Sequence, residues 1–239
     1  MNNIRSALYK YERRGVLAGK RAKKSYAQCG EDLIIDFVLN AIGIQFPSYL
    51  DLGAHHPSYL NNTYIFYQRG CRGINVEANP NLMPDFFQKR KRDVNLNIGI
   101  TDTPGNEALD FYIMTAPTMS TFSEAEARRL ERESSIRISQ VIKIPTVTLV
   151  DLVHQHAGDT FPDILTCDLE GLDEMVIESL KAFKQPQLPK IICLETATFR
   201  EHGFGSKKTP LIEKVCAMGY TVHADTFINT IFCRQDVVN

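Results

Sequence analysis

The chain has 239 residues, of which 44% are apolar and 23% charged, with a net charge of −1. This composition is typical of globular proteins and excludes a disordered, collagenous or coiled-coil chain. No apolar run approaches the ~20 residues that a membrane-spanning helix needs, and the N-terminus lacks the apolar core of a secretory signal. We therefore expect a cytoplasmic protein of one or two domains, one being the simpler prediction.

The charge is unevenly distributed along the chain. Residues 1–24 contain eight Lys or Arg and one Glu, a net +7, so the other 215 residues carry −8. Such an arm could meet a phosphate-bearing substrate, a membrane surface or an acidic protein, although a solvated N-terminal helix is the simpler interpretation. Only two aromatic residues, both tyrosines, lie among these charges, so we expect no nucleic-acid binding.

The six cysteines contain no C-x-x-C pair. Cys167 and Cys193 lie inside apolar runs, where a cysteine behaves as a small buried hydrophobe. The sequence therefore predicts reduced thiols rather than a disulfide framework or a zinc site.

Short apolar runs alternate with amphipathic segments along the chain. Ser123 and Glu126 are placed for a capping box at the start of one charged helix. The alternation predicts an α/β fold with a mostly parallel sheet, helices on both faces and a C-terminal antiparallel hairpin. The predicted strands are 48–53, 73–77, 94–100, 108–114, 141–147, 163–168, 190–195, 220–224 and 230–234. The predicted helices are 31–42, 61–69, 81–90, 123–133, 173–183 and 210–218, with a short helix that follows the strand 141–147 and runs through His154.

The ends of the strands are the informative positions, because such sheets bind ligands beyond the carboxyl ends of their strands. Gly53 follows the first strand and allows a tight turn close to a ligand, whereas His55 and His56 stand where a dinucleotide motif has further glycines. Glu77 ends the second strand, 24 residues after Gly53, where an acid accepts hydrogen bonds from ribose hydroxyls. One glycine and a ribose acid favour adenosine without a pyrophosphate, as in S-adenosylmethionine.

Acidic residues follow the fourth and fifth core strands. Asp168 and Glu170 could orient a substrate hydroxyl, accept its proton or hold a divalent cation such as Mg²⁺, which the sequence leaves undecided. Glu170 and Asp173 could instead cap the next helix. We therefore expect one acid of the pair Asp168 and Glu170 to cap this helix and the other to take part in catalysis, and we favour Asp168 as the catalytic residue. Glu195 either binds substrate or is a buried acid held by local hydrogen bonds.

The two histidines of the first turn are further candidates. One of them could be the general base, since histidine titrates near neutral pH, while the other caps a helix or packs. We assign His56 to catalysis, together with Asp168 and Glu170, and His55 to substrate binding. A bound Mg²⁺ could replace the base by lowering the pKa of the hydroxyl.

Taken in order, these motifs resemble the FkbM family of S-adenosylmethionine-dependent methyltransferases. Each motif is weak alone, but the ordered set is specific and extends from about Ser25 to Arg234. The matching runs are Ser25–Asp32 in the pattern S-x-x-Q-x-G-E-D, Tyr49–Pro57, Asn62–Tyr64 with Phe66 and Tyr67, Arg72–Pro80, Asp168–Gly171 and Ile192–Glu195.

The resemblance implies a Rossmann-like class I methyltransferase fold and methyl transfer to a hydroxyl oxygen. The acceptor would often be a sugar of a glycan, a nucleotide-sugar or a glycosylated natural product. By the same resemblance, Asp51, Gly53 and Ala54 line the methionine end of the cofactor, Glu77 binds its ribose, and Asn97 lies near its adenine.

The resemblance also implies that Gln28 closes over the pocket and that Asp168 faces the methyl group. Residues 115–138 vary in such proteins, and here they contain a charged helix that could form a substrate lid. We predict a basic arm at 1–24 and a single methyltransferase domain at 25–239, with 115–138 as the candidate lid.

Other functions stay open at this stage. They are methyl transfer to a non-sugar small molecule, a lipid or a protein, and a non-catalytic scaffold that keeps the cofactor pocket. A nicotinamide-dependent dehydrogenase is disfavoured by the single glycine. The sequence does not determine the acceptor, the metal requirement or whether the chain forms a homo-oligomer.

Overall fold

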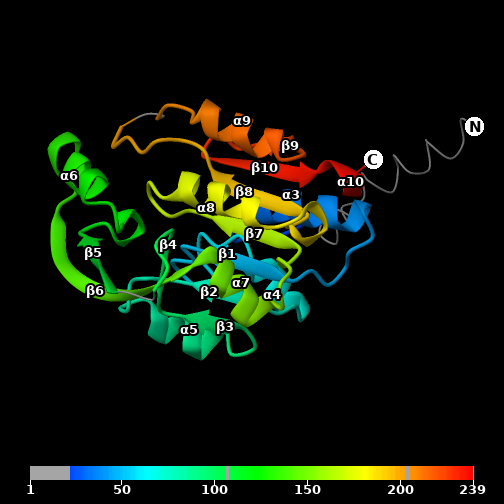
Figure 1. Cartoon of the computed structure of the whole chain (residues 1–239), viewed down its shortest axis with the longest axis horizontal. Helices are drawn as coiled ribbons and strands as arrows, with labels where there is room; N and C mark the ends of the chain where they lie inside the picture. Colours follow the sequence, from blue (N-terminus) through cyan, green and yellow to red (C-terminus); the bar gives the residue numbers. More distant parts are fainter. Residues whose placement is uncertain (1–21, 106–107, 203–204, 239) are drawn as a thin grey trace, which may run out of the picture.

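The computed structural model describes residues 22–105, 108–202 and 205–238. Most of the predicted basic arm therefore lies outside the described residues. Of its last residues, Lys23 forms an ion pair with Asp36 at 2.8 Å, and Lys24 lies over the ring of Tyr26. Figure 1 shows helices packed on a large central sheet, with a smaller sheet and α6 (Glu124–Glu133) at one end, on the left of the view.

The large sheet of the described chain has seven strands. β10 (Asn229–Arg234) runs antiparallel to β8 and β9, which confirms the predicted hairpin beside a mostly parallel sheet. The direction of the strand order changes between β1 and β7, which is where open α/β sheets bind ligands. The other strands, in spatial order from the parallel edge, are β3 (Val94–Leu96), β2 (Gly73–Val76), β1 (Tyr49–Leu52), β7 (Ile164–Cys167) and β8 (Ile191–Glu195), with β9 (Tyr220–Asp225) at the far edge.

Helices cover both faces of this sheet. Successive side chains of β8 point to opposite faces, so Ile192 and Leu194 pack on one side while Ile191 and Cys193 pack on the other. Each fully buried aliphatic side chain of this kind contributes about 1.5–3 kcal/mol to folding. The first face is covered by α7 (Leu149–Ala157), α8 (Asp173–Ser179) and α9 (Thr209–Ala217), and the second by α3 (Glu31–Ala41) and α4 (Tyr64–Arg69).

The run predicted as one strand at 94–100 is divided between two sheets. Its second half, β4 (Gly99–Thr101), pairs with β6 (Ile138–Thr148), and β6 pairs with β5 (Ala108–Met114). The break falls at Asn97, whose side-chain amide donates to the carbonyls of Glu77 and Ala78. Side-chain anchoring of this kind cannot be read from an apolar run, so the single-strand prediction was wrong here.

The remaining elements are short. They are α5 (Met83–Lys89), α10 (Gln235–Val238) and three 3₁₀ turns, η1 (Pro117–Met119), η2 (Leu180–Ala182) and η3 (Gln185–Gln187). Ser123 caps α6 by accepting a hydrogen bond from the Glu126 amide at 3.2 Å. The second half of the predicted capping box is not formed, because the Glu126 carboxylate pairs with Arg129 instead.

All six cysteines lie in the described ranges, and all are free thiols, as the sequence predicts. Within the part of the chain that the structure describes, no helix has the length and apolarity to cross a membrane.

Candidate active site

A cavity of ≈ 450 Å³ lies beyond the carboxyl ends of the parallel strands, at the switch in strand order between β1 and β7. Its floor is formed by residues that follow β1, β2, β7 and β8. Residues 117–122, between β5 and α6, and residues 197–200, after β8, form further walls. Of the sequence-predicted site residues, those on the cavity wall are Gln28, Gly53, His55, Glu77, Asp168, Glu170 and Glu195.

Gly53 brings the turn after β1 against the loop after β7. Its φ of 77° is in the left-handed region, and a Cβ atom at this position would lie 1.9 Å from the Asp168 carbonyl oxygen. Only glycine fits both the conformation and the contact. The turn after β1 can therefore pack directly against the backbone of the loop that follows β7.

Glu77 is almost fully buried at the end of β2. Its two carboxylate oxygens accept hydrogen bonds from the backbone amides of His55 at 2.9 Å and Asn79 at 2.7 Å. Each oxygen keeps a lone pair that can accept from a ligand hydroxyl. Burial, opposed by these two bonds, raises the pKa of Glu77 to about 7.

Asp51 lies behind the cavity wall. Its carboxylate accepts hydrogen bonds from the Asn61 amide at 3.1 Å and the Thr63 hydroxyl at 2.9 Å. The buried guanidinium of Arg90 donates to the side-chain oxygens of the same two residues. Asp51 therefore holds the first turn in place. The helix predicted from residue 61 begins only at Tyr64, because these side chains are used in the network.

Ala54 and Asn97 also lie outside the residues that line the cavity. Ala54 packs against Met83 and Phe86, and Asn97 bonds the carbonyl of Glu77. Both residues support the loops that carry Gly53 and Glu77. Their predicted direct contacts with the cofactor stay predictions.

Gln28 reaches the cavity because its segment is fastened at both ends. Asp32 accepts hydrogen bonds from the Ser25 hydroxyl and the Tyr26 amide. Glu31, which is fully buried, accepts from Asn229 at 3.0 Å and from Thr226 at 2.8 Å in the terminal hairpin. The acids of the S-x-x-Q-x-G-E-D pattern thus place an exposed Gln28 at the cavity.

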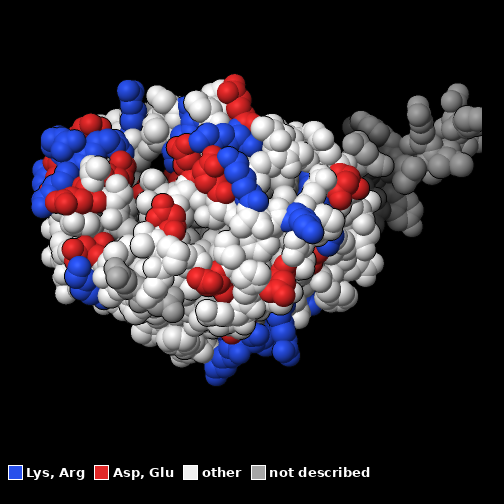
Figure 2. Space-filling view, in the orientation of Figure 1, with Lys and Arg blue, Asp and Glu red and all other residues white. Residues whose placement is uncertain are grey.

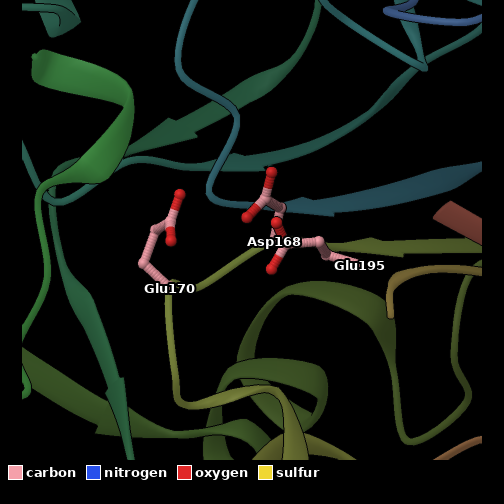
Figure 3. Close-up of side chains that lie close together, drawn as sticks. All are labelled: Asp168, Glu170 and Glu195. Carbon is pink, nitrogen blue, oxygen red and sulfur yellow. The ribbon is translucent and has the colours of Figure 1, made fainter. Parts of the chain in front are cut away.

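Three carboxylates converge in the same cavity. Asp168 and Glu195 follow the neighbouring strands β7 and β8, and Glu170 comes from the loop between β7 and α8. One carboxylate oxygen of each lies within 4.8 Å of the others. Figure 3 shows Asp168 and Glu195 meeting head to head, with the Glu170 carboxylate beside them.

The loop after β7 is built to present Glu170. Glu170 and Gly171 have φ values of 45° and 98°, and the Thr121 hydroxyl donates to the Glu170 carbonyl at 2.8 Å. Asp173, rather than Glu170, organises the loop, because its carboxylate accepts from the Leu169 amide at 3.1 Å. The expectation that one acid of the pair Asp168 and Glu170 caps the next helix was therefore wrong, because the N-cap of α8 receives no side-chain hydrogen bond.

The negative charge of the three carboxylates is only partly neutralised by neighbouring cations. Lys208 donates to Glu195 at 3.0 Å and to Asp173 at 3.2 Å. No cation contacts the carboxylate of Asp168 or Glu170 in the described chain. Asp168 is open to the cavity, but protein surrounds the cavity on most sides. This burial, together with repulsion among the acids, raises the pKa values of Asp168, Glu170 and Glu195.

The two histidines have different surroundings. His56 is not on the cavity wall, and its Nδ1 accepts from the backbone amides of Ser58 and Tyr59 at 3.1 and 3.0 Å. His55 lines the cavity, and its buried Nδ1 has no hydrogen-bond partner in the described residues. Burial lowers the pKa of His55, so its ring is neutral near pH 7. The geometry thus puts His55, and not His56, within reach of a ligand.

A second cavity of ≈ 300 Å³ adjoins the first and shares Glu170 and Glu195 with it. It lies between α6 and the residues after β8, where Arg129, Arg200 and Lys208 contribute positive charge. Figure 2 shows the acidic and basic side chains gathered over α6. Residues 197–200 carry no motif, so the sequence gives no sign of this wall.

The mostly parallel α/β sheet carries a one-glycine turn after β1 and a buried acid after β2, both at the cavity. Residues 51–222, well over half of the chain, match the sequence model of the Methyltransferase FkbM domain. The chain therefore belongs to the FkbM methyltransferase family, whose methyl donor is S-adenosylmethionine.

Solved structures with a similar architecture are distant in sequence. The TehB-like S-adenosylmethionine-dependent methyltransferase of Corynebacterium glutamicum is 11% identical, with 97% of this chain and 98% of that chain covered and a TM-score of 0.43. The 1,6-didemethyltoxoflavin N1-methyltransferase of Burkholderia thailandensis is also 11% identical, with 97% and 88% covered and a TM-score of 0.42. No curated protein matches the sequence.

Proposed function

We propose that the protein transfers a methyl group from S-adenosylmethionine to a hydroxyl oxygen of a sugar. The sugar would belong to a glycan, a nucleotide-sugar or a glycosylated natural product. The observation that supports this proposal is the carboxylate cluster beside Gly53 and Glu77. Such a cluster offers several hydrogen-bond acceptors to a polyhydroxylated molecule next to the methyl donor.

The residues of the cavity fit this cofactor. Gly53 lets the turn after β1, which lines the cavity, pack directly against the Asp168 backbone, where a Cβ atom would collide. Glu77 keeps free lone pairs for the two ribose hydroxyls. Ile98, Ile100 and Phe111 give the wall an apolar part against which an adenine ring can pack. When bound, the cofactor supplies an electrophilic methyl group on a sulfonium.

Asp168 is the residue that we assign to proton removal. A sugar hydroxyl is a weak nucleophile until its proton is accepted in the transition state. As the acceptor oxygen forms its bond to the methyl carbon, the carbon–sulfur bond breaks, the hydroxyl proton passes to a carboxylate oxygen of Asp168, and the sulfonium becomes a neutral thioether. The raised pKa of Asp168 makes it a stronger base than a carboxylate with an ordinary pKa.

The covering segments align the acceptor and exclude water. Residues 117–122 lie over one side of the cavity, and residues 197–200 over another. This arrangement supports the candidate lid at 115–138 as the segment that selects the acceptor. It also supports one domain, 25–239, as the working unit.

The test is the Asp168→Asn variant on a panel of hydroxylated acceptors that includes sugars, nucleotide-sugars and non-sugar alcohols. We expect the variant to bind S-adenosylhomocysteine nearly as well as the wild type and to lose turnover, because the amide cannot accept the proton. A collapse of cofactor affinity would place Asp168 in the binding shell instead. Methylation of the non-sugar alcohols alone would refute the sugar assignment.

A further inference from the structure

The carboxylate cluster carries more negative charge than the described chain neutralises. Within the described residues, the acids Asp168, Glu170, Glu195 and Asp173 form ion pairs with a single cation, the ammonium group of Lys208, although Arg129 and Arg200 line the adjoining cavity. Lys208 contacts Glu195 and Asp173 only. A buried carboxylate without a counter-charge is costly, so Glu170 favours a proton or a cation at this cluster.

Glu170 gives a separate indication that a ligand belongs here. This residue is only 9% exposed. Its carboxylate forms no hydrogen bond or ion pair within residues 22–105, 108–202 and 205–238, since only its backbone carbonyl is bonded, to Thr121. Figure 3 shows this carboxylate beside those of Asp168 and Glu195. A buried acid directed at two further acids is the arrangement of a cation site rather than of a structural network.

We infer that Asp168, Glu170 and Glu195 bind one hard divalent cation, of the type of Mg²⁺ or Mn²⁺, next to the acceptor hydroxyl. The inference rests on the proposed function, which it deepens. An all-oxygen ligand set selects such cations over zinc or copper. The three side chains come from two strand ends and one loop, so the site exists in the folded chain without rearrangement of the sheet.

The distances suit this class of ion. Two opposite oxygen ligands lie about 4.2 Å apart on Mg²⁺ and about 4.8 Å apart on Ca²⁺, from metal–oxygen distances of about 2.1 and 2.4 Å. The ligand atoms of the three carboxylates lie within 4.8 Å of one another. Side-chain rotations that bring these separations to about 4.2 Å or less would place the three oxygens on one Mg²⁺ ion.

A three-ligand site leaves about three positions of the octahedron open. Two neighbouring hydroxyls of a sugar can occupy two of these positions together. The cation then orients the diol and lowers the pKa of the hydroxyl that reacts. The second oxygen of Asp168 stays available to accept the proton. The inferred acceptor is therefore a molecule with adjacent hydroxyls.

The test is the binding of Mn²⁺ alone to the full chain, followed by electron paramagnetic resonance. Mg²⁺ and Ca²⁺ are added as competitors, and neither cofactor nor acceptor is needed. We expect one Mn²⁺ per chain and at least a tenfold weaker affinity in Glu170→Gln and Glu195→Gln. The matched control is Glu213→Gln, which removes an exposed acid of α9 outside the cavity and should leave Mn²⁺ binding unchanged.

A second measurement uses the wild type alone, so it does not depend on whether the variants fold. In the wild type, Mn²⁺ should broaden the amide NMR signals of residues 168–171 and 195–198 before all others. Absence of saturable Mn²⁺ binding, or equal affinity in Glu170→Gln and wild type, would overturn the cation site. Binding of S-adenosylhomocysteine in EDTA is measured separately, so loss of the cation site and failure of the proposed function remain distinguishable.

Discussion

At the scale of single residues, the site depends on groups whose local geometry is unusual. Gly53 and Glu170 have left-handed backbone conformations, and Glu77 is a buried acid that receives two backbone hydrogen bonds. Outside functional sites, such features cost stability without a compensating gain. For Gly53 and Glu77, these features predict a measurable effect of substitution on cofactor binding.

Gly53→Ala should abolish cofactor binding. The new methyl group would lie 1.9 Å from the Asp168 carbonyl oxygen, and alanine at φ 77° adds a strain of about 1–3 kcal/mol. We expect at least a tenfold loss of affinity for S-adenosylhomocysteine in calorimetry. Gly43→Ala is the matched control, because Gly43 has φ 81° but nothing within 4 Å of its Cβ position. Equal affinities in the two variants would contradict this role of Gly53.

Glu77 should make cofactor affinity dependent on pH. Its pKa is raised to about 7, so the carboxylate loses a proton as the pH rises through 7 and becomes a better acceptor for ribose hydroxyls. We expect affinity for S-adenosylhomocysteine to fall about tenfold from pH 8 to pH 6. Glu77→Gln should bind weakly with a flat profile over this range. A wild-type profile without slope, or an unchanged slope in Glu77→Gln, would refute the assignment.

The raised pKa of Glu77 also makes the free energy of unfolding depend on pH. The pKa of Glu77 rises from an ordinary value of 4.5 to about 7 on folding. The folded chain therefore binds more protons than the unfolded chain in this window, and the contribution of Glu77 to stability decreases as the pH rises through it. Glu77→Gln should remove this part of the pH dependence of urea unfolding.

At the scale of elements, the catalytic sheet and the covering segment are distinct. The parallel strands hold Gly53, Glu77, Asp168 and Glu195, whereas η1 and α6 lie on the small sheet formed by β4, β5 and β6. Ala127 and Leu130 of α6 pack with Tyr112 and Met114 of β5, in a cluster of their own. We therefore expect changes in α6 to alter acceptor recognition without altering cofactor binding.

Ser123→Ala tests this separation. It removes the N-cap of α6 at a cost of about 1 kcal/mol, and should raise the KM for the acceptor while the affinity for S-adenosylhomocysteine stays constant. Thr148→Ala removes the corresponding cap of α7, where the Thr148 hydroxyl accepts from the Asp151 amide at 3.1 Å. Because α7 packs on the large sheet, this control should lose stability without a selective change in KM. Identical kinetic effects in both variants would argue against a lid.

At the scale of the whole molecule, the sequence predicts the architecture well because the strands are short apolar runs bounded by polar turns. The order of motifs also places Glu77, Asp168 and Glu195 at the carboxyl ends of the parallel strands. Local sequence patterns do not show which polar side chains form hydrogen bonds with distant parts of the chain instead of binding a ligand. For this reason Asp51 lies behind the cavity wall, bonded to Asn61 and Thr63, although its motif predicts a contact with the cofactor.

Two further parts of the site depend on tertiary structure that a single sequence does not reveal. His55 and His56 are adjacent, and only the left-handed conformation of His55 and the backbone bonds of His56 decide which ring meets the cavity. Residues 197–200 form a wall because they meet α6 across the second cavity. The basic arm, the cytoplasmic location and a homo-oligomeric state stay predictions.

The most direct test of the account is calorimetric titration of the purified chain with S-adenosylhomocysteine, with NAD as the control ligand. The one-glycine turn and Glu77 predict saturable binding of S-adenosylhomocysteine at one site per chain and no binding of NAD, because the turn lacks the glycines that accommodate a pyrophosphate. Absence of binding to S-adenosylhomocysteine, or equal binding of NAD, would contradict the assignment of this cavity to methyl transfer.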